Sequence, residues 1–169
     1  VRPGRAVLSF IRYPDPRLTA KAELREGVDD DLREIGERLL EAAREAKAYG
    51  LAAAHMGEIE PVVVISGDGV GRDYLLLFNP QVTAMSDQTE ADEEGSVSLP
   101  GVRVMIERPL WAEISYMDAA GQSQSARFER FAARVALHEI EQMNGVFFLS
   151  KLSRLKREMV LKKARKLPG

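Results

Sequence analysis

The stretch HEIEQMNG, residues 138–145, decides how the fold is read. It closes a segment over residues 130–144 whose apolar side chains recur at helical spacing, and the glycine that follows is typical of the position where a helix ends. Residues four apart on a helix point in nearly the same direction, so His138 and Gln142 should share one face. The segment therefore predicts a mostly buried helix, with the apolar side chains of Phe131, Val135, Leu137 and Ile140.

Outward from this helix, the periodicity of the chain changes several times. Residues 29–31 are three aspartates that supply an N-cap and first-turn carboxylates for a helix running to about Lys47. A last helix is predicted over about residues 152–166. β-Branched or apolar runs bounded by turn residues predict strands over residues 61–66, 74–79, 102–106, 111–117 and 123–130. This order of helices and antiparallel strands is that of an α+β domain.

The composition sets further bounds. The chain has 169 residues, of which 45% are hydrophobic and 30% charged, so we expect one folded domain over residues 1–169. A net charge of −2 argues against a surface that is basic throughout, as nucleic-acid binding would need. There is no cysteine, which excludes disulfides and thiolate metal ligands. No apolar run approaches the roughly 20 residues of a membrane span, and we expect a cytoplasmic protein.

Three segments carry a resemblance to a known family. They are GLAAAHMG over residues 50–57, EGSVSL over residues 94–99 and HEIEQMNG over residues 138–145. In this order and spacing they resemble the three signature motifs of peptide deformylases, which read G-x-G-Φ-A-A-x-Q, E-G-C-Φ-S and H-E-x-D-H. The turn over residues 13–18 and the basic C-terminal helix resemble the ends of the same family. The resemblance thus covers essentially the whole chain.

The resemblance implies antiparallel sheets around a central helix that bears an H-E-x-x-H motif, with N- and C-terminal helices. It also implies metal-dependent removal of the formyl group from new polypeptides, with Fe²⁺ or Zn²⁺. In the family, the cysteine and both histidines bind the metal, and the glutamate between the histidines moves the protons. By resemblance, His138 fits the first metal histidine, Glu139 fits the general base, and the backbone N–H of Val97 fits an oxyanion donor.

Two of the three metal positions differ from the family pattern. Ser96 stands where the cysteine should be, and Gln142 stands where the second histidine should be. Neutral oxygen donors are poor ligands for zinc or ferrous iron compared with a thiolate and an imidazole. We therefore predict that no cofactor binds tightly and that the protein is an impaired or inactive deformylase homologue, a relic that retains ligand or peptide binding.

Two other interpretations of these residues keep catalysis. His55 replaces the glutamine of the first motif, and Ala48 replaces its first glycine. In the first interpretation, His55, His138 and a carboxylate such as Glu139 form a rebuilt metal site for an active amidohydrolase. In the second, Ser96 is a catalytic serine with a histidine as its base. The simpler reading is that His55 is hydrogen-bonded in a vacant pocket and that Ser96 is an isosteric remnant of cysteine.

The pocket for the substrate is predicted around the same motifs. Arg134 lies four residues before His138, where the resemblance implies an apolar wall for a methionine side chain. A guanidinium there would suit a carboxylate, either Glu139, Glu94 or that of a ligand, although the side chain would also reach solvent if the helix turned it away. The pocket is predicted to contain Tyr49, Gly50, Glu94, Arg103 and Arg134, and to take a formylated peptide or a small carboxylate.

The end of the chain is strongly basic. Residues 151–166 include eight lysines and arginines but only one acidic residue, Glu158, and Leu152, Leu155 and Met159 form an apolar stripe. Such a helix docks on RNA, on a membrane surface or on its own domain. The resemblance adds contact with the ribosome as a third hypothesis for function. The alternative is a solvated charged face whose apolar stripe packs on the core.

Overall fold

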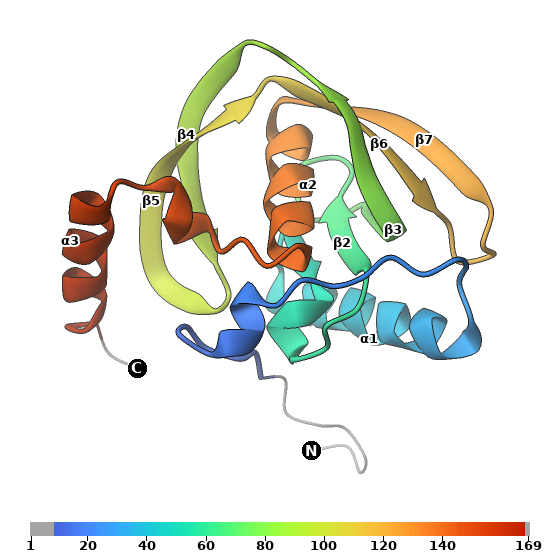
Figure 1. Cartoon of the computed structure of the whole chain (residues 1–169), viewed down its shortest axis with the longest axis horizontal. Coiled ribbons are helices and arrows are strands. Elements are labelled where there is room, and N and C mark those ends of the chain that lie inside the picture. Colours follow the sequence, from blue (N-terminus) through green and yellow to red (C-terminus); the bar gives the residue numbers. More distant parts are fainter. Residues whose placement is uncertain (1–8, 168–169) are drawn as a thin grey trace.

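The computed structural model describes residues 9–167, which form a five-stranded antiparallel sheet, a two-stranded ribbon and three α-helices (Figure 1). The sheet has the order β1-β2-β3-β6-β7 and the ribbon pairs β4 with β5. The strands are β1 Gly50–Ala52, β2 Val62–Ser66, β3 Tyr74–Met85, β4 Thr89–Ser96, β5 Leu99–Pro109, β6 Trp111–Met117 and β7 Ser123–Glu129. The helices are α1 Asp30–Ala46, α2 Arg130–Met143 and α3 Arg154–Ala164, with 3-10 turns at Pro16–Thr19, Ala53–Met56 and Phe148–Lys151. The predicted α+β class is confirmed.

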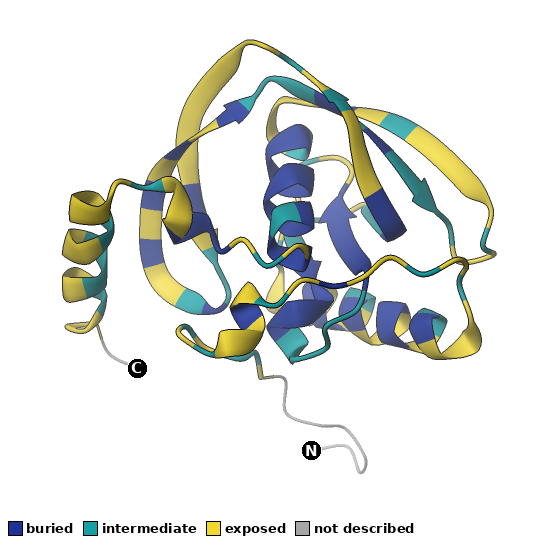
Figure 2. Cartoon of the chain, in the orientation of Figure 1, coloured by how far each residue is buried: buried dark blue, intermediate teal, exposed yellow. Residues whose placement is uncertain are grey.

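Helix α2 stands in the middle of the molecule, between the large sheet and the ribbon (Figure 1). Figure 2 shows it buried along most of its length. It ends as predicted, because Gly145 adopts φ +82° directly after the C-cap, and a Cβ there would lie 2.7 Å from the carbonyl oxygen of Thr19. One prediction is wrong: Phe131 is 36% exposed rather than buried, because the first turn of α2 faces a cavity.

Strand β2 is packed on both faces, which explains why its sequence is a continuous apolar run rather than an alternating one. Val63 and Ile65 pack in the cluster that contains α2, whereas Val62 and Val64 pack in the cluster that contains α1. Successive side chains of a strand point to opposite faces, so a strand covered by helices on both sides is apolar at every position.

Helix α1 begins where the sequence predicts. The Asp29 side chain accepts a hydrogen bond from the backbone N–H of Leu32 at 2.8 Å, which is the N-cap arrangement. Leu32, Ile35 and Leu39 face the sheet and are buried. The helix ends at Ala46, and its C-cap Lys47 has the left-handed conformation with φ 54°. This end places the next residues, over 48–50, against α2.

The ribbon was only half predicted. The sequence indicated β5 but not β4, and it also left out β1 and the second half of β3. Strand β4 reads TEADEEGS, and among its residues only Glu94 is buried, so it has no apolar alternation to reveal it. Strand β5 does alternate, with Val102, Val104 and Ile106 buried on one face.

Helix α3 is slightly shorter than predicted and packs on a different face. Val160, Leu161 and Ala164 contact the apolar cluster beside β5, and so does Leu152 before the helix. Leu155 and Met159, which the predicted stripe placed with Leu152, are 69% and 61% exposed. The reading in which that stripe packs on the core is therefore wrong for these two residues. Within residues 9–167, no helix has the length and apolar character needed to cross a membrane.

Candidate functional site

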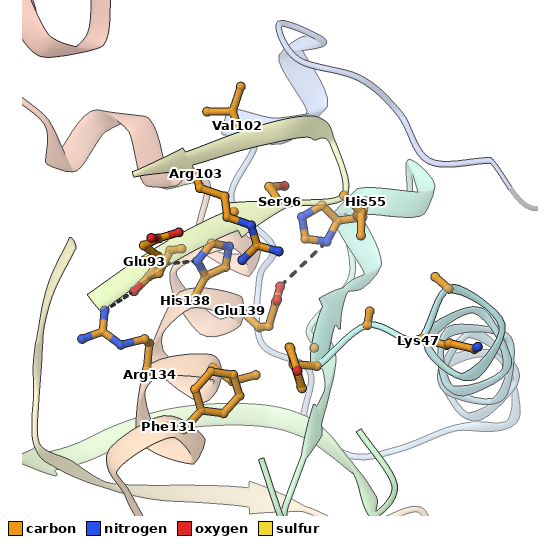
Figure 3. A pocket seen from close by; sticks show the side chains of 18 of the residues that line it. Lys47, His55, Glu93, Ser96, Val102, Arg103, Phe131, Arg134, His138 and Glu139 are labelled. Atoms are coloured by element: carbon orange, nitrogen blue, oxygen red, sulfur yellow. Dashed lines mark hydrogen bonds and ion pairs between the residues drawn. The ribbon is translucent and has the colours of Figure 1, made fainter. Parts of the chain in front are cut away.

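A cavity of about 350 Å³ lies against the middle of α2 (Figure 3). Its wall comes from the segment between α1 and β1, from the turn of the β4–β5 ribbon and from one face of α2. All the predicted site residues except Gln142 line this cavity, namely Tyr49, Gly50, His55, Glu94, Ser96, Val97, Arg103, Arg134, His138 and Glu139. Three segments far apart in the sequence are thus brought to one place.

The approach of β1 to α2 depends on Gly50. A Cβ at this position would lie 2.6 Å from Cγ1 of Val135 and 2.9 Å from Cγ of Glu139. Any side chain other than hydrogen would push the strand away from the helix, which is the use of glycine at a close backbone approach. This contact closes the side of the cavity formed by β1.

A buried ion-pair network forms the floor of the cavity, with Glu94 at its centre. Arg108 binds both oxygens of Glu94, at 2.8 and 2.9 Å, and Nη1 of Arg134 donates to Oε2 at 2.7 Å. His138 lies 2.7 Å from Oε1 through its Nδ1. Burial alone would raise the pKa of Glu94, but the hydrogen bonds and charges of Arg108 and His138 outweigh it and lower this pKa to about 2. Glu94 is therefore a firmly ionised carboxylate.

Arg134 does not reach solvent. Besides Glu94, it donates to the carbonyl oxygens of Ile106 at 2.7 Å and Glu90 at 2.8 Å, so its guanidinium lies between α2 and both strands of the ribbon. Of the two carboxylates considered from the sequence, Glu94 is the partner and Glu139 is not among its contacts. Arg134 thus occupies the space between α2 and the ribbon with a fully engaged polar group.

Sequence reasoning missed Arg108, which is 2% exposed and also pairs with Glu141 at 2.7 Å. A signal was available, because Arg108 continues the buried alternation of Val104 and Ile106 on β5. An arginine at an inward position of a strand needs a carboxylate partner, since a buried charge is otherwise strongly unfavourable.

His138 keeps one ring nitrogen toward the cavity. Its Nδ1 is engaged by Glu94, and no described residue forms a hydrogen bond with Nε2. Burial opposes the charged imidazolium, but the hydrogen bond with Glu94 and the nearby carboxylates prevail and raise the pKa of His138. His138 is held in orientation by Glu94, as a ligand or a proton carrier would be.

His55 and Glu139 face each other without a hydrogen bond. Nδ1 of His55 accepts the backbone N–H of Ala52 at 3.1 Å, and lies 3.8 Å from Oε1 of Glu139, too far for a hydrogen bond. Burial, with the charge of His138, lowers the pKa of His55 to about 3, so this ring is neutral. Its proton is therefore on Nε2, and both Nε2 and Oε1 of Glu139 are buried without a partner. Burial raises the pKa of Glu139 to about 7.

Ser96 is held by its own turn. Its hydroxyl oxygen accepts the backbone N–H of Ser98 at 3.1 Å, and neither histidine hydrogen-bonds to it. A nucleophilic serine needs a base within hydrogen-bond reach and with a free lone pair. Nδ1 of His55 is already an acceptor and Nε2 carries the proton. The geometry is not that of a serine–histidine pair.

Gln142 does not line the cavity. Its amide nitrogen donates to the carbonyl oxygen of Leu18 at 2.6 Å, and its Oε1 has no partner. Sharing a helix face with His138 is therefore not enough to bring it into the cavity. Over residues 9–167, no group of three or more histidine, cysteine or acidic side chains is arranged to hold a metal ion. The donors left at the three predicted metal positions are Nε2 of His138, the hydroxyl of Ser96 and Oε1 of Gln142.

Comparisons with known proteins find similarity to one family along nearly the whole chain. The polypeptide deformylase family model matches residues 7–158. A protein from Bradyrhizobium diazoefficiens named peptide deformylase-like is 40% identical over 160 residues, covering 94% of this chain and 92% of its own length. A Brucella suis protein named peptide deformylase is 35% identical over 164 residues, with 96% and 94% covered. The crystal structure of Ehrlichia chaffeensis peptide deformylase in complex with actinonin gives a TM-score of 0.87 at 30% identity, with 96% and 98% covered.

Proposed function

The chain belongs to the peptide deformylase family, and we propose that it binds a small ligand in the family's pocket without carrying out metal-dependent deformylation. The three metal positions carry this proposal. A structural or catalytic zinc site needs at least three strong protein ligands. Here one imidazole nitrogen, one neutral hydroxyl and one neutral amide oxygen stand at those positions, and the amide nitrogen of Gln142 is bonded to Leu18. These residues do not fit tightly bound iron or zinc.

The charges around the cavity support the same conclusion. Arg108 and Arg134 both contact Glu94, so the carboxylate nearest to His138 is already paired with two guanidinium groups. Both oxygens of Glu94 are engaged by these guanidinium groups and by His138, so Glu94 has no free oxygen to offer as a ligand to a divalent cation beside His138. The rebuilt site with His55 also lacks a firmly anionic ligand, because Glu139, which lies 3.8 Å from His55, has its pKa raised to about 7 and is mostly neutral below that pH.

The place of a methionine side chain is also changed. By resemblance, position 134 belongs to the apolar wall that receives this side chain. The buried guanidinium of Arg134 and its hydrogen bonds to Glu94, Glu90 and Ile106 occupy that side of the cavity. An apolar side chain placed there would have to break these bonds or leave them desolvated, at a cost of about 1–3 kcal/mol for each unpaired group. The geometry therefore disfavours a formyl-methionyl peptide.

The test combines metal content with activity. The full chain is purified from a medium replete in iron and zinc, and its metal is measured by elemental analysis beside a formyl-methionyl peptide assay. Glu139→Gln, purified in the same way, sets the background because it lacks the general base that the family reaction needs. We expect far less than one metal per chain and the same rate for both proteins. About one iron or zinc per chain, with a rate above that of the variant, would overturn the proposal in favour of an active hydrolase.

A second candidate function concerns α3. Leu155 and Met159 leave two large apolar side chains exposed among basic residues of the same helix. Exposed apolar groups within a basic surface favour a partner that is both negatively charged and able to cover them. We therefore keep ribosome binding through α3 as an alternative that is compatible with the first.

The test for this candidate is co-sedimentation with ribosomes. The variant with Leu155→Ser and Met159→Ser should lose the association, whereas Leu24→Ser, which alters an exposed leucine outside α3, should keep it. Failure of the unmodified protein to sediment with ribosomes, or equal sedimentation of all three proteins, would rule out this role for α3.

A further inference from the structure

We propose that the cavity is a site for a small organic carboxylate, which Arg103 and Nε2–H of His55 bind while Tyr49 and Phe131 contact its apolar body. This inference rests on the ligand-binding function proposed above and names the class of ligand. It also moves the anion from Arg134, where the sequence suggested it, to Arg103.

His55 provides a donor that has no partner in the protein. Its side chain is 1% exposed, it lines the cavity, and its Nε2 is buried without a hydrogen bond. The backbone N–H of Ala52 occupies Nδ1, which fixes the proton on Nε2 in the neutral ring. A buried N–H without an acceptor is unfavourable by about 1–3 kcal/mol, so an acceptor group in the cavity would relieve this deficit.

Arg103 provides the charge. It lines the cavity from β5, and Figure 3 shows its side chain extending over the cavity toward the side where the two histidines and Glu139 lie. No carboxylate of the described residues lies within ion-pair distance of its guanidinium. Lys47 and Glu93 also line the cavity, and because their charges have opposite signs they leave the net charge of the lining unchanged.

The fixed charges of the floor are already paired with one another, so the charge that is left for a ligand is that of Arg103. Arg134 belongs to the wall and pairs with Glu94, whereas Arg108 does not line the cavity and pairs with both Glu94 and Glu141. The guanidinium of Arg103, in contrast, forms no ion pair or hydrogen bond with any side chain of residues 9–167. Guanidinium groups bind carboxylates through paired hydrogen bonds, so a carboxylate is the group that this lining fits best.

The rest of the lining is apolar and aromatic. Tyr49 and Phe131 form an edge-to-face pair with ring centroids 4.8 Å apart, and they are 49% and 36% exposed at the cavity. Val135 of α2 adds a further apolar side chain to the lining. A volume of about 350 Å³ is at the low end of the range for small-molecule sites, roughly 300–1,000 Å³. A compact carboxylic acid with an aromatic or branched apolar part therefore matches this lining, which has polar groups on one side and apolar groups on the other.

Benzoate is a suitable probe, and benzamide is its uncharged counterpart. Binding is measured by calorimetry and by chemical-shift changes on the full chain at pH 6, below the raised pKa of Glu139. We expect benzoate to bind at least tenfold more tightly than benzamide. Arg103→Gln should weaken benzoate binding by about tenfold to a hundredfold, since a hydrogen bond to a charged group is worth that much. The control Arg154→Gln, at an arginine with an 86% exposed side chain on α3, should bind as the unmodified protein does.

His55 is tested by a substitution that keeps a donor. His55→Gln should retain part of the affinity, and His55→Leu, of similar size, should lose it; unfolding curves show whether each variant is folded. Equal binding of benzoate and benzamide, benzoate binding unaffected by Arg103→Gln, or tighter binding of inorganic phosphate than of benzoate would overturn the carboxylate site. Metal content is measured on the same sample. A metal-free protein that ignores benzoate refutes this inference alone, whereas one iron or zinc per chain with deformylase activity refutes the proposed function.

Discussion

Replacing Glu139 with glutamine tests what a buried carboxyl group without a cation does to the free energy of unfolding. Glu139 is 6% exposed, and its Oε1 has no hydrogen-bond partner. Burial raises its pKa from 4.5 to about 7; the charge of His138 opposes this, and the charge of Glu94 adds to it. The unfolded chain loses this proton near pH 4.5, whereas the folded protein keeps it to about pH 7.

The direction of the effect follows from this difference. A group whose pKa is raised by folding contributes stability in full below its unfolded pKa, and this contribution is lost as the pH rises to the folded pKa. The shift from 4.5 to about 7 corresponds to roughly 3 kcal/mol. About 2.5 kcal/mol of it should be lost between pH 5 and pH 8.5. Glutamine does not titrate and is spared this loss.

Urea unfolding at the two pH values measures the effect. The stability of Glu139→Gln relative to the unmodified protein should rise by about 2.5 kcal/mol from pH 5 to pH 8.5. Any constant effect of the new amide cancels, because only the change with pH is compared. Glu93→Gln is the control, since Glu93 lies on the same cavity but is exposed. A difference that stays the same at both pH values would refute the view that Glu139 is buried without a compensating charge.

Three further variants test other parts of the site. The double variant Ser96→Cys, Gln142→His should recover at least part of the metal binding by elemental analysis; a folded variant without metal would mean that the surrounding cations exclude it. Glu94→Gln leaves the buried guanidinium of Arg134 without a carboxylate and that of Arg108 with Glu141 alone, and should lower the free energy of unfolding by about 3–5 kcal/mol; a loss below about 1 kcal/mol would contradict the network. Gly50→Ala places a methyl group 2.6 Å from Cγ1 of Val135, and should cost about 1–3 kcal/mol in urea unfolding; unchanged stability would show that the strand has room.

The sequence was sufficient for elements that bury an apolar face. Asp29 caps α1 and Gly145 follows α2 because each position needs a particular side chain or backbone conformation. Strand β4 was missed because it is held by pairing with β5 rather than by its own apolar residues. The register of β4 depends on its partner strand, and the sequence pattern of a single strand contains no information about its partner.

For the site, the motifs were enough to gather the residues but not to orient them. Glu94, His138 and Glu139 all line the cavity, as their places in the motifs suggested. The orientation of Gln142 could not be predicted, because its amide bonds to Leu18, a residue far away in the sequence. Helical spacing indicates a shared face, but side-chain direction depends on which hydrogen-bond partners the fold brings near.

The β4–β5 ribbon has only two strands, and such a hairpin is marginal by itself in water. One end of the ribbon is held against the central helix by ion pairs. Glu94 of β4 contacts both Arg108 of the ribbon and Arg134 of the helix. Because these ion pairs are buried, dissolved salt should screen them only weakly. Because Glu94 belongs to β4 and Arg134 to α2, loss of this contact would separate one end of the ribbon from the helix and alter the cavity that the two elements line.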